Sequence, residues 1–173
     1  MQVFLIFAGF QITNGDGIAT FDTIYPGWYL GRTVHMHIKV HLGGTYDSTT
    51  GIYTGGSTIH TGQLFFNDTL SDSVAQQSPY SSHTVTRLLN SEDGIYAGGG
   101  SYTLMDIQYV NADLSFSGGL ITTVTLGVQS SLISNDTATT TTPSILGSSG
   151  NCISGGLFWF GSFLFACYIF SFF

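Results

Sequence analysis

The sequence predicts an all-β fold, an antiparallel β-sandwich, and three observations lead to this prediction. Only 8% of the 173 residues are charged, against roughly 25% in an ordinary globular domain, which disfavours long surface helices. Aromatic residues still make up 14% of the chain, so it is not a disordered polar tract. Stretches rich in Thr, Val, Ile and Tyr alternate with turns built on the 23 glycines, a spacing typical of sandwiches and barrels.

The expected elements follow one another along residues 11–129, which we predict to be the folded core. A short helix is expected between the third and fourth strands, at Leu70–Gln77, with Thr69 or Ser71 as its N-cap. Glycine-rich loops separate the strands, and Pro26-Gly27 is expected to form a tight turn before the second one. The predicted strands are Ile18–Ile24, Thr33–His41, Ile59–Phe66, Leu104–Val110 and Leu120–Val128.

The composition changes on both sides of this core. Residues 1–10 form an atypical start that lacks the basic residues of a signal peptide. Residues 130–152 are rich in Ser and Thr and are predicted to be a stalk or linker. Residues 153–173 carry no charge and are long enough to cross a bilayer. This hydrophobic tail could associate with a membrane as an anchor, be a removed lipid-anchor signal, or be a mis-spliced end without a role.

Charge and cysteine content exclude several function classes. The net charge is −7 with only three Lys and Arg residues, too few for a nucleic-acid surface. Both cysteines, Cys152 and Cys167, lie outside the predicted core, which therefore has no disulfide framework or thiolate metal site. Two glycosylation sequons begin at Asn67 and Asn135 and are consistent with a secreted or cell-surface glycoprotein.

The second predicted strand carries the most informative pattern. Side chains alternate between the faces of a strand, so Val34, Met36, Ile38 and Val40 should face the core. His35 and His37 then lie side by side on the opposite face, where they could bind one metal ion. Imidazoles bind Zn, Cu, Fe or Ni, so the pair does not select the metal, and a solvated polar face is the simpler alternative. His41 is a weaker ligand candidate, and His60 and His83 are expected in loops or at strand edges.

A phenol and a cation come shortly before this histidine pair. A Tyr29 phenolate would be a hard donor suited to Fe(III), and Arg32 would favour that phenolate and hold an anionic substrate oxygen. The alternative is that Tyr29 packs in the structure and that Arg32 pairs with an acid such as Asp22.

Together these residues resemble the iron site of the intradiol ring-cleavage dioxygenases, in particular the secreted branch of the family. The pattern is Pro26-x-x-Tyr29 followed by Arg32-x-x-His35-x-His37. Downstream, residues 60–66 (HTGQLFF) resemble the family strand whose Gln lies beside the active-site Arg, here Gln63. The resemblance covers roughly residues 10–128.

This resemblance implies a β-sandwich that holds a non-haem Fe(III), with a small aromatic diol and O2 as substrates. Tyr29 and His37 would be axial ligands and His35 an equatorial one. Arg32 would stabilise the electron-rich substrate, and Gln63 would orient Arg32. The ferric ion would act as a Lewis acid on a catechol or hydroxyquinol-like substrate, which is opened to a muconate-type diacid.

The family uses a second tyrosine ligand, well upstream of the Pro-x-x-Tyr turn. The sequence before Tyr29 holds only Tyr25, which is expected to point elsewhere, while Tyr46 and Tyr53 have no support as substitutes. We therefore expect an incomplete sandwich that lacks the N-terminal strands, with its core-facing residues (Val34, Met36 and Ile38) only partly covered. The alternatives to an active dioxygenase are a catalytically impaired β-fragment displayed at a surface and, more weakly, a zinc site.

Overall fold

The computed structural model describes residues 6–128 and 165–172 of the chain. The predicted stalk at 130–152, the Asn135 sequon and residues 153–164 of the hydrophobic tail lie outside these described residues. Within them, no helix has both the length and the apolar character needed to cross a membrane.

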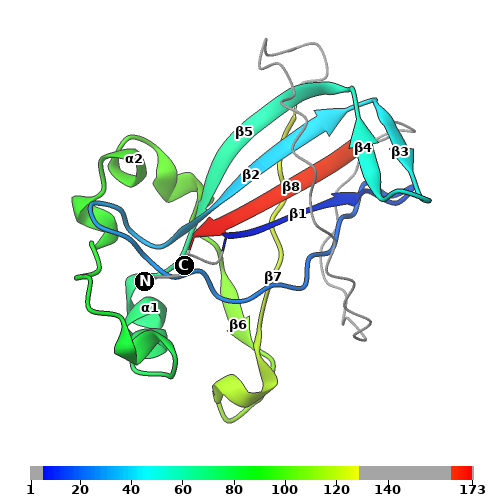
Figure 1. Cartoon of the computed structure of the whole chain (residues 1–173). Coiled ribbons are helices and arrows are strands. Elements are labelled where there is room, and N and C mark those ends of the chain that lie inside the picture. The colour runs from blue at the N-terminus through cyan, green and yellow to red at the C-terminus, as the bar shows by residue number, and fades with distance from the viewer. Residues whose placement is uncertain (1–5, 129–164, 173) are drawn as a thin grey trace.

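The main sheet has four strands in the order β1-β8-β2-β5, and every neighbouring pair is antiparallel. Figure 1 shows β2 between β8 and β5, with the two α-helices near one end of the sheet and the β3–β4 hairpin at the other. The all-β antiparallel prediction is confirmed. The strands are β1 (Ile6–Ile12), β2 (His35–Leu42), β5 (Ser57–Phe65) and β8 (Phe165–Phe172).

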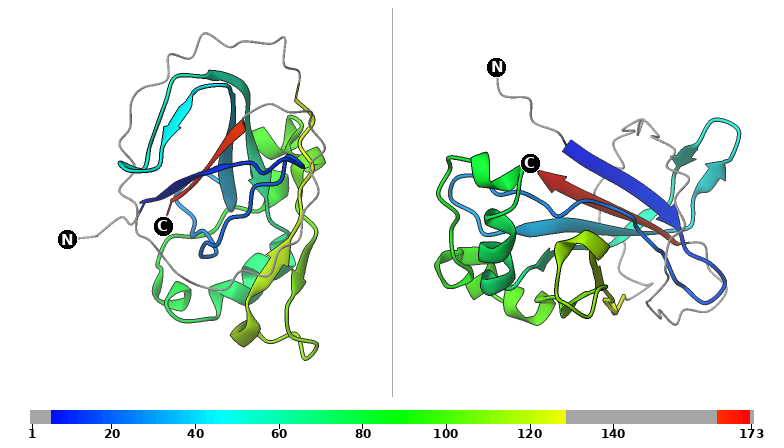
Figure 2. Two further views of the ribbon diagram at one scale, coloured as in Figure 1. Left: turned by 90° about the vertical axis from the view of Figure 1, so that its right-hand side faces the viewer. Right: turned by 90° about the horizontal axis from the view of Figure 1, so that it is seen from below.

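Two short hairpins stand apart from this sheet. β3 (Thr45–Asp47) pairs with β4 (Ile52–Thr54), and β6 (Ile107–Tyr109) pairs with β7 (Leu120–Thr122). The β3–β4 hairpin lies within the connection from β2 to β5, and Figure 2 shows β6 and β7 on one side of the main sheet.

Helical segments connect β5 to β6. Helix α1 (Asp68–Ala75) begins at Asn67, whose side chain accepts the N–H of Thr69, so the predicted helix exists but starts earlier and has a different N-cap. Four-residue helix α2 (Gly94–Ala97) and the 3-10 turns were not predicted, because such short pieces show no helical period. The 3-10 turns are η1 (Tyr80–Ser82), η2 (Asn90–Glu92), η3 (Gly100–Thr103) and η4 (Phe116–Gly118).

The core lies against one face of β2 and β5. The alternation predicted for β2 is confirmed, since Val34, Met36, Ile38 and Val40 are all buried. The expectation that these side chains would be only partly covered is wrong. The irregular chain around Phe21 to Trp28, together with the segment from Met105 to Val128, packs over this face of the sheet.

Three of the five predicted strands were wrong or too long. Ile18–Ile24 forms no strand and instead belongs to the irregular covering layer, where Phe21 packs against the core. Leu104–Val110 and Leu120–Val128 shorten to the three-residue strands β6 and β7. Apolar side chains in these segments pack against the core, but most of the backbone there pairs with no neighbouring strand. The pattern of apolar residues therefore predicted more strand than the structure forms.

We expect the core to tolerate substitution poorly on the covered face of β5. Leu64→Ala should lower the free energy of unfolding by about 2–5 kcal/mol, because Leu64 is 4% exposed and its removal leaves a cavity. Thr61→Ala on the same strand is exposed and should change stability by less than about 0.5 kcal/mol. Urea unfolding followed by circular dichroism measures both, and equal effects would contradict this assignment of faces.

Candidate functional site

The candidate site begins at a turn between residues 29 and 32. The backbone N–H of Arg32 donates to the carbonyl of Tyr29 at 3.3 Å, and Gly31 has φ +84°. A positive φ at the third position is the signature of a type II turn, and glycine adopts it without strain. The sequence predicted a tight turn at Pro26-Gly27, whereas this turn lies three residues later, at residues 29–32. It places the side chains of Tyr29 and Arg32 close together, with Arg32 Nη1 3.5 Å from the Tyr29 hydroxyl.

The chain leading into this turn is held by residues 80–85. The Tyr80 hydroxyl donates to the carbonyl of Tyr25 at 2.6 Å, and the indole N–H of Trp28 donates to the carbonyl of Val85 at 2.7 Å. His83 Nε2 lies 2.9 Å from the Trp28 carbonyl, so it has a structural contact here. These long-range bonds fix the position of the residue immediately before Tyr29.

His35 and His37 point toward each other on the face of β2 opposite the core. Their Nε2 atoms are 3.3 Å apart, close to the separation of two neighbouring ligands bound at about 2.1 Å to one metal ion. His35 Nδ1 lies 2.7 Å from the carbonyl of Thr33, which can only accept a hydrogen bond. The Nδ1–H tautomer that this requires leaves the His35 Nε2 lone pair facing His37. Tyr29 completes the group, with its ring centroid 5.9 Å from that of His35.

Both imidazoles are held in the neutral form. Burial lowers the pKa of His35 to about 4, and the nearby charge of Arg32 contributes to this shift. Burial followed by the charges of Arg32 and Lys39 lowers the pKa of His37 as well. Neutral imidazole is the form that binds metal ions, so at neutral pH this pair is already in the binding form.

Arg32 contacts three side chains of the site. Its Nη2 donates to Gln63 Oε1 at 2.5 Å, and its Nε donates to Asp93 Oδ2 at 2.8 Å. The sequence suggested an ion pair between Arg32 and Asp22. Arg32 pairs with Asp93 instead, and Asp22 is an exposed residue of the irregular covering layer. Gln63 reaches Arg32 because the antiparallel register sets it opposite His37, on the same face of the sheet.

Asp93 is the residue that sequence reasoning missed. Its side chain is fully buried, and its two oxygens accept four N–H groups, from Arg32, Thr33, Ile95 and Tyr96, at 2.8–3.0 Å. Burial alone would raise the pKa of Asp93, but these hydrogen bonds and the Arg32 charge outweigh it and lower the pKa to about 2. The only local signal was an Asp before a short helix, which identifies an N-cap and does not reveal its distant partner.

The other candidate residues lie elsewhere. The hydroxyls of Tyr25 and Ser71 are hydrogen-bonded at 2.7 Å, and the Tyr25 ring packs on Phe66. Burial raises the pKa of Tyr25. Tyr53 donates to the carbonyl of Gly43, at the far end of β2, and Tyr46 packs against Phe10. His41 follows a register shift at which β5 carries the extra residue Ile59, and it lies beside Thr58, about 13 Å along β2 from His37. His60 is half-buried within β5.

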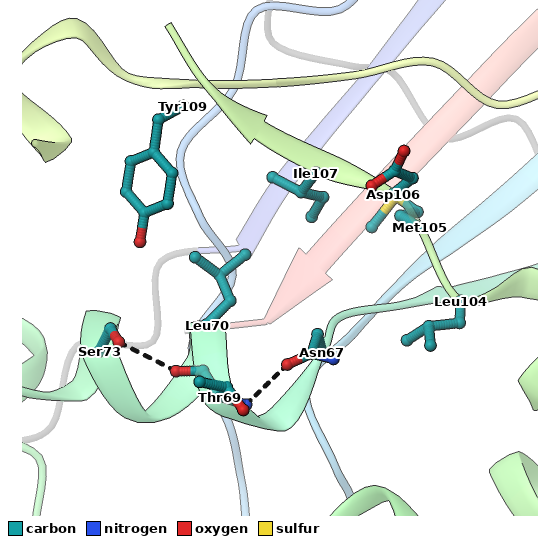
Figure 3. A pocket seen from close by; sticks show the side chains of 9 residues that line it. All are labelled: Asn67, Thr69, Leu70, Ser73, Leu104, Met105, Asp106, Ile107 and Tyr109. Atoms are coloured by element: carbon teal, nitrogen blue, oxygen red, sulfur yellow. Dashed lines mark hydrogen bonds between the residues drawn. The ribbon is translucent and has the colours of Figure 1, made fainter. Parts of the chain in front are cut away.

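Two further features of the described residues bear on this site. Within residues 6–128 and 165–172, no group of three or more His, Cys, Asp or Glu side chains gathers as a metal site, so a third donor here would be the Tyr29 phenol. A cavity of about 470 Å³ lies between α1 and β6, lined among others by Leu70, Ile107 and Tyr109 (Figure 3). Its lining includes a single carboxylate, Asp106, and no imidazole, so it contains none of the residues of the Tyr29–His37 region.

The chain is similar to a protein of known structure. The structure is similar to that of an intradiol ring-cleavage dioxygenase from Tetranychus urticae, with a TM-score of 0.57 and 29% sequence identity over 71% of this chain. This similarity supports a distant relationship. The match covers 53% of the solved protein, so this chain spans about half of its length. No family model matches the chain, and no curated protein is significantly similar to it.

The buried neutral His35 should make stability depend on pH. In metal-free protein, the unfolded chain binds a proton near pH 6.5 that folded His35 binds only near pH 4. The free energy of unfolding should therefore fall by on the order of 3 kcal/mol as the pH drops through this window. Urea unfolding at a series of pH values measures this loss. His35→Gln should flatten the curve, and an unchanged slope in that variant would contradict the assignment.

Proposed function

We propose that this chain carries a non-haem Fe(III) site of the intradiol ring-cleavage type, with a small aromatic diol and O2 as its substrates. The observation that carries the proposal is the 3.3 Å approach of the two Nε2 atoms of His35 and His37, beside the phenol of Tyr29 and the guanidinium of Arg32. The distant relationship to a solved dioxygenase of this type supports the same reaction class.

The donor set fits a ferric ion. Tyr29 would supply a hard anionic oxygen and the two histidines neutral nitrogens, and His35 already donates its other ring N–H to a backbone carbonyl, as metal-bound histidines commonly do. When bound, Fe(III) would supply the Lewis acidity that activates the diol oxygens. Tyr29 is 37% exposed, so the site opens to solvent on the side where a substrate would enter.

The protein's own contribution would be orientation and charge. Arg32 would hold a negatively charged oxygen of the diol, because its Nη1 faces the Tyr29 hydroxyl while its other nitrogens are bonded to Gln63 and Asp93. Gln63 would keep Arg32 beside His37. Thr33 would fix the His35 tautomer through its carbonyl. Each of these groups is positioned by the ends of β2 and β5 or by the turn before β2.

A second candidate is a β-domain that keeps this motif without turnover and is displayed at a surface. It is favoured by the positions of Tyr25, Tyr46 and Tyr53, whose described contacts are with other parts of the chain. None of these three tyrosines contacts the His35–His37 pair in the described bonds, so none of them would serve as the family's second tyrosine ligand. Secretion or surface display itself stays a prediction of the sequence.

Iron loading tests the proposal directly. We expect one Fe(III) per chain and a visible tyrosinate-to-iron band that is weak, because Tyr29 is the tyrosine that the contacts of the described residues place beside the histidine pair. Tyr29→Phe should remove the band, whereas Tyr102→Phe, at a residue that is 94% exposed, should leave it unchanged. Metal analysis that finds zinc instead of iron would support a zinc site. A full-strength band with fast catechol turnover would contradict the expectation of an incomplete ligand set.

Histidine substitution separates the two candidates. His35→Ala should lower iron affinity at least about a hundredfold, because one of three ligands and the buried hydrogen bond to Thr33 are lost. His60→Ala on β5 provides the control and should bind iron like the wild type. Oxygen uptake with catechol then distinguishes an enzyme from a domain without turnover. Equal iron binding by both variants would exclude a site at His35.

A further inference from the structure

We propose that Asp93 is a positioning residue that fixes the guanidinium of Arg32 in the candidate site. This inference rests on the proposed function for its substrate, but its geometric part can be tested without metal. Asp93 is fully buried, whereas Arg32 is 19% exposed, so the ion pair joins the protein interior to the open side of the site.

The contacts of Arg32 show how Asp93 determines its orientation. A guanidinium is planar and carries five N–H donors in fixed directions. Asp93 accepts from Nε at 2.8 Å, and Gln63 accepts from Nη2 at 2.5 Å. With Nε bound to Asp93 and Nη2 bound to Gln63, Nη1 is left facing the hydroxyl of Tyr29. Gln63 alone would leave the plane free to rotate about a single hydrogen bond.

The same carboxylate also acts on the histidine side of the site. Asp93 Oδ2 accepts the backbone N–H of Thr33 at 3.0 Å, and the Thr33 carbonyl lies 2.7 Å from His35 Nδ1. The Thr33 hydroxyl donates to Asn90 at 2.6 Å, which holds the residue from a second direction. Asp93 therefore supports Arg32 directly and His35 through the Thr33 backbone.

Asp93 is itself rigidly held. Its Oδ1 accepts the N–H groups of Ile95 and Tyr96 at the start of α2. Asn90, three residues earlier, donates its side-chain N–H at 2.8 Å to the carbonyl of Phe66, which directly follows β5. A carboxylate with four N–H donors has its lone pairs fully used, so it has no reason to reorient toward water. The guanidinium is thus tied to the sheet through residues 90–93.

For binding, the consequence is that the Arg32 guanidinium has a fixed orientation before any ligand arrives. A flexible Arg would lose conformational entropy each time it engaged an anionic oxygen, whereas Arg32 has already paid that cost on folding. The geometry thus favours a ligand that presents a negatively charged oxygen next to the Tyr29 hydroxyl.

The metal-free experiment uses the side-chain Nε–H signal of Arg32 in proton–nitrogen correlation spectra. In the wild type this proton should exchange slowly with water, because it is hydrogen-bonded to a buried carboxylate. Asp93→Asn should accelerate the exchange at least about tenfold, since an uncharged amide has one accepting oxygen in place of the two that now accept four N–H groups. Rapid exchange in the wild type would overturn the proposal, and this measurement needs no folded variant.

The iron-loaded experiment is a double-mutant cycle that measures catechol affinity from the visible catecholate-to-iron band. We expect Asp93→Asn and Arg32→Ala each to weaken catechol binding about tenfold or more, and the double variant to be weaker than Arg32→Ala by no more than about twofold. Asp93→Glu should restore part of the affinity. Ser71→Ala, which removes a buried hydrogen bond to Tyr25, is the control for a purely structural loss and should leave the affinity unchanged.

The outcomes separate the two proposals. Additive effects of Asp93→Asn and Arg32→Ala, or a catechol affinity that Asp93→Asn leaves unchanged, would overturn the positioning role. No iron-dependent catechol band in the wild type would overturn the proposed function, and the exchange of the Arg32 Nε–H would then still decide whether Asp93 fixes the guanidinium.

Discussion

The candidate site depends on one buried charge. Asp93 is removed from water, and a carboxylate is stable there only when donors surround it. The four donors come from Arg32, from the backbone of Thr33 and from the first turn of α2, so satisfying this one group ties residues 32–33, just before β2, to residues 93–96. The turn at residues 29–32 then has little freedom, because both of its ends are tied: Trp28 to Val85 and Thr33 to Asp93.

The sheet provides the other half of the arrangement. Strand β2 uses its two faces differently, with apolar residues against the core and His35 and His37 on the opposite face. The register with β5 then sets Gln63 opposite His37. A shift of one residue would turn Gln63 into the core and expose Leu64, so the hydrophobic effect that holds the register also holds the polar contact to Arg32.

Some of this arrangement could be predicted from the sequence. The alternation along β2 was visible because it follows the two-residue period of a strand, and the histidine pair follows from it. The predicted strand Ile18–Ile24 failed because its apolar residues are buried by irregular chain, which has no period. Asp93 could not be found because its partner, Arg32, lies 61 positions away in the chain. No local pattern indicates such a contact, so the sequence alone favours Asp22, an acid closer in the chain, as the partner of Arg32.

The order of strands in the main sheet also has a consequence for how the molecule forms. β2 and β5 make a hairpin whose pairing needs only nearby chain, but β1 joins them only through β8, which comes from far along the sequence. During synthesis, the central hairpin can assemble as soon as it leaves the ribosome, whereas β1 has no neighbour until the chain reaches residue 172. A nascent chain would therefore expose an open edge of β2 for much of its translation, at the stage when contact with other unfinished chains is most harmful.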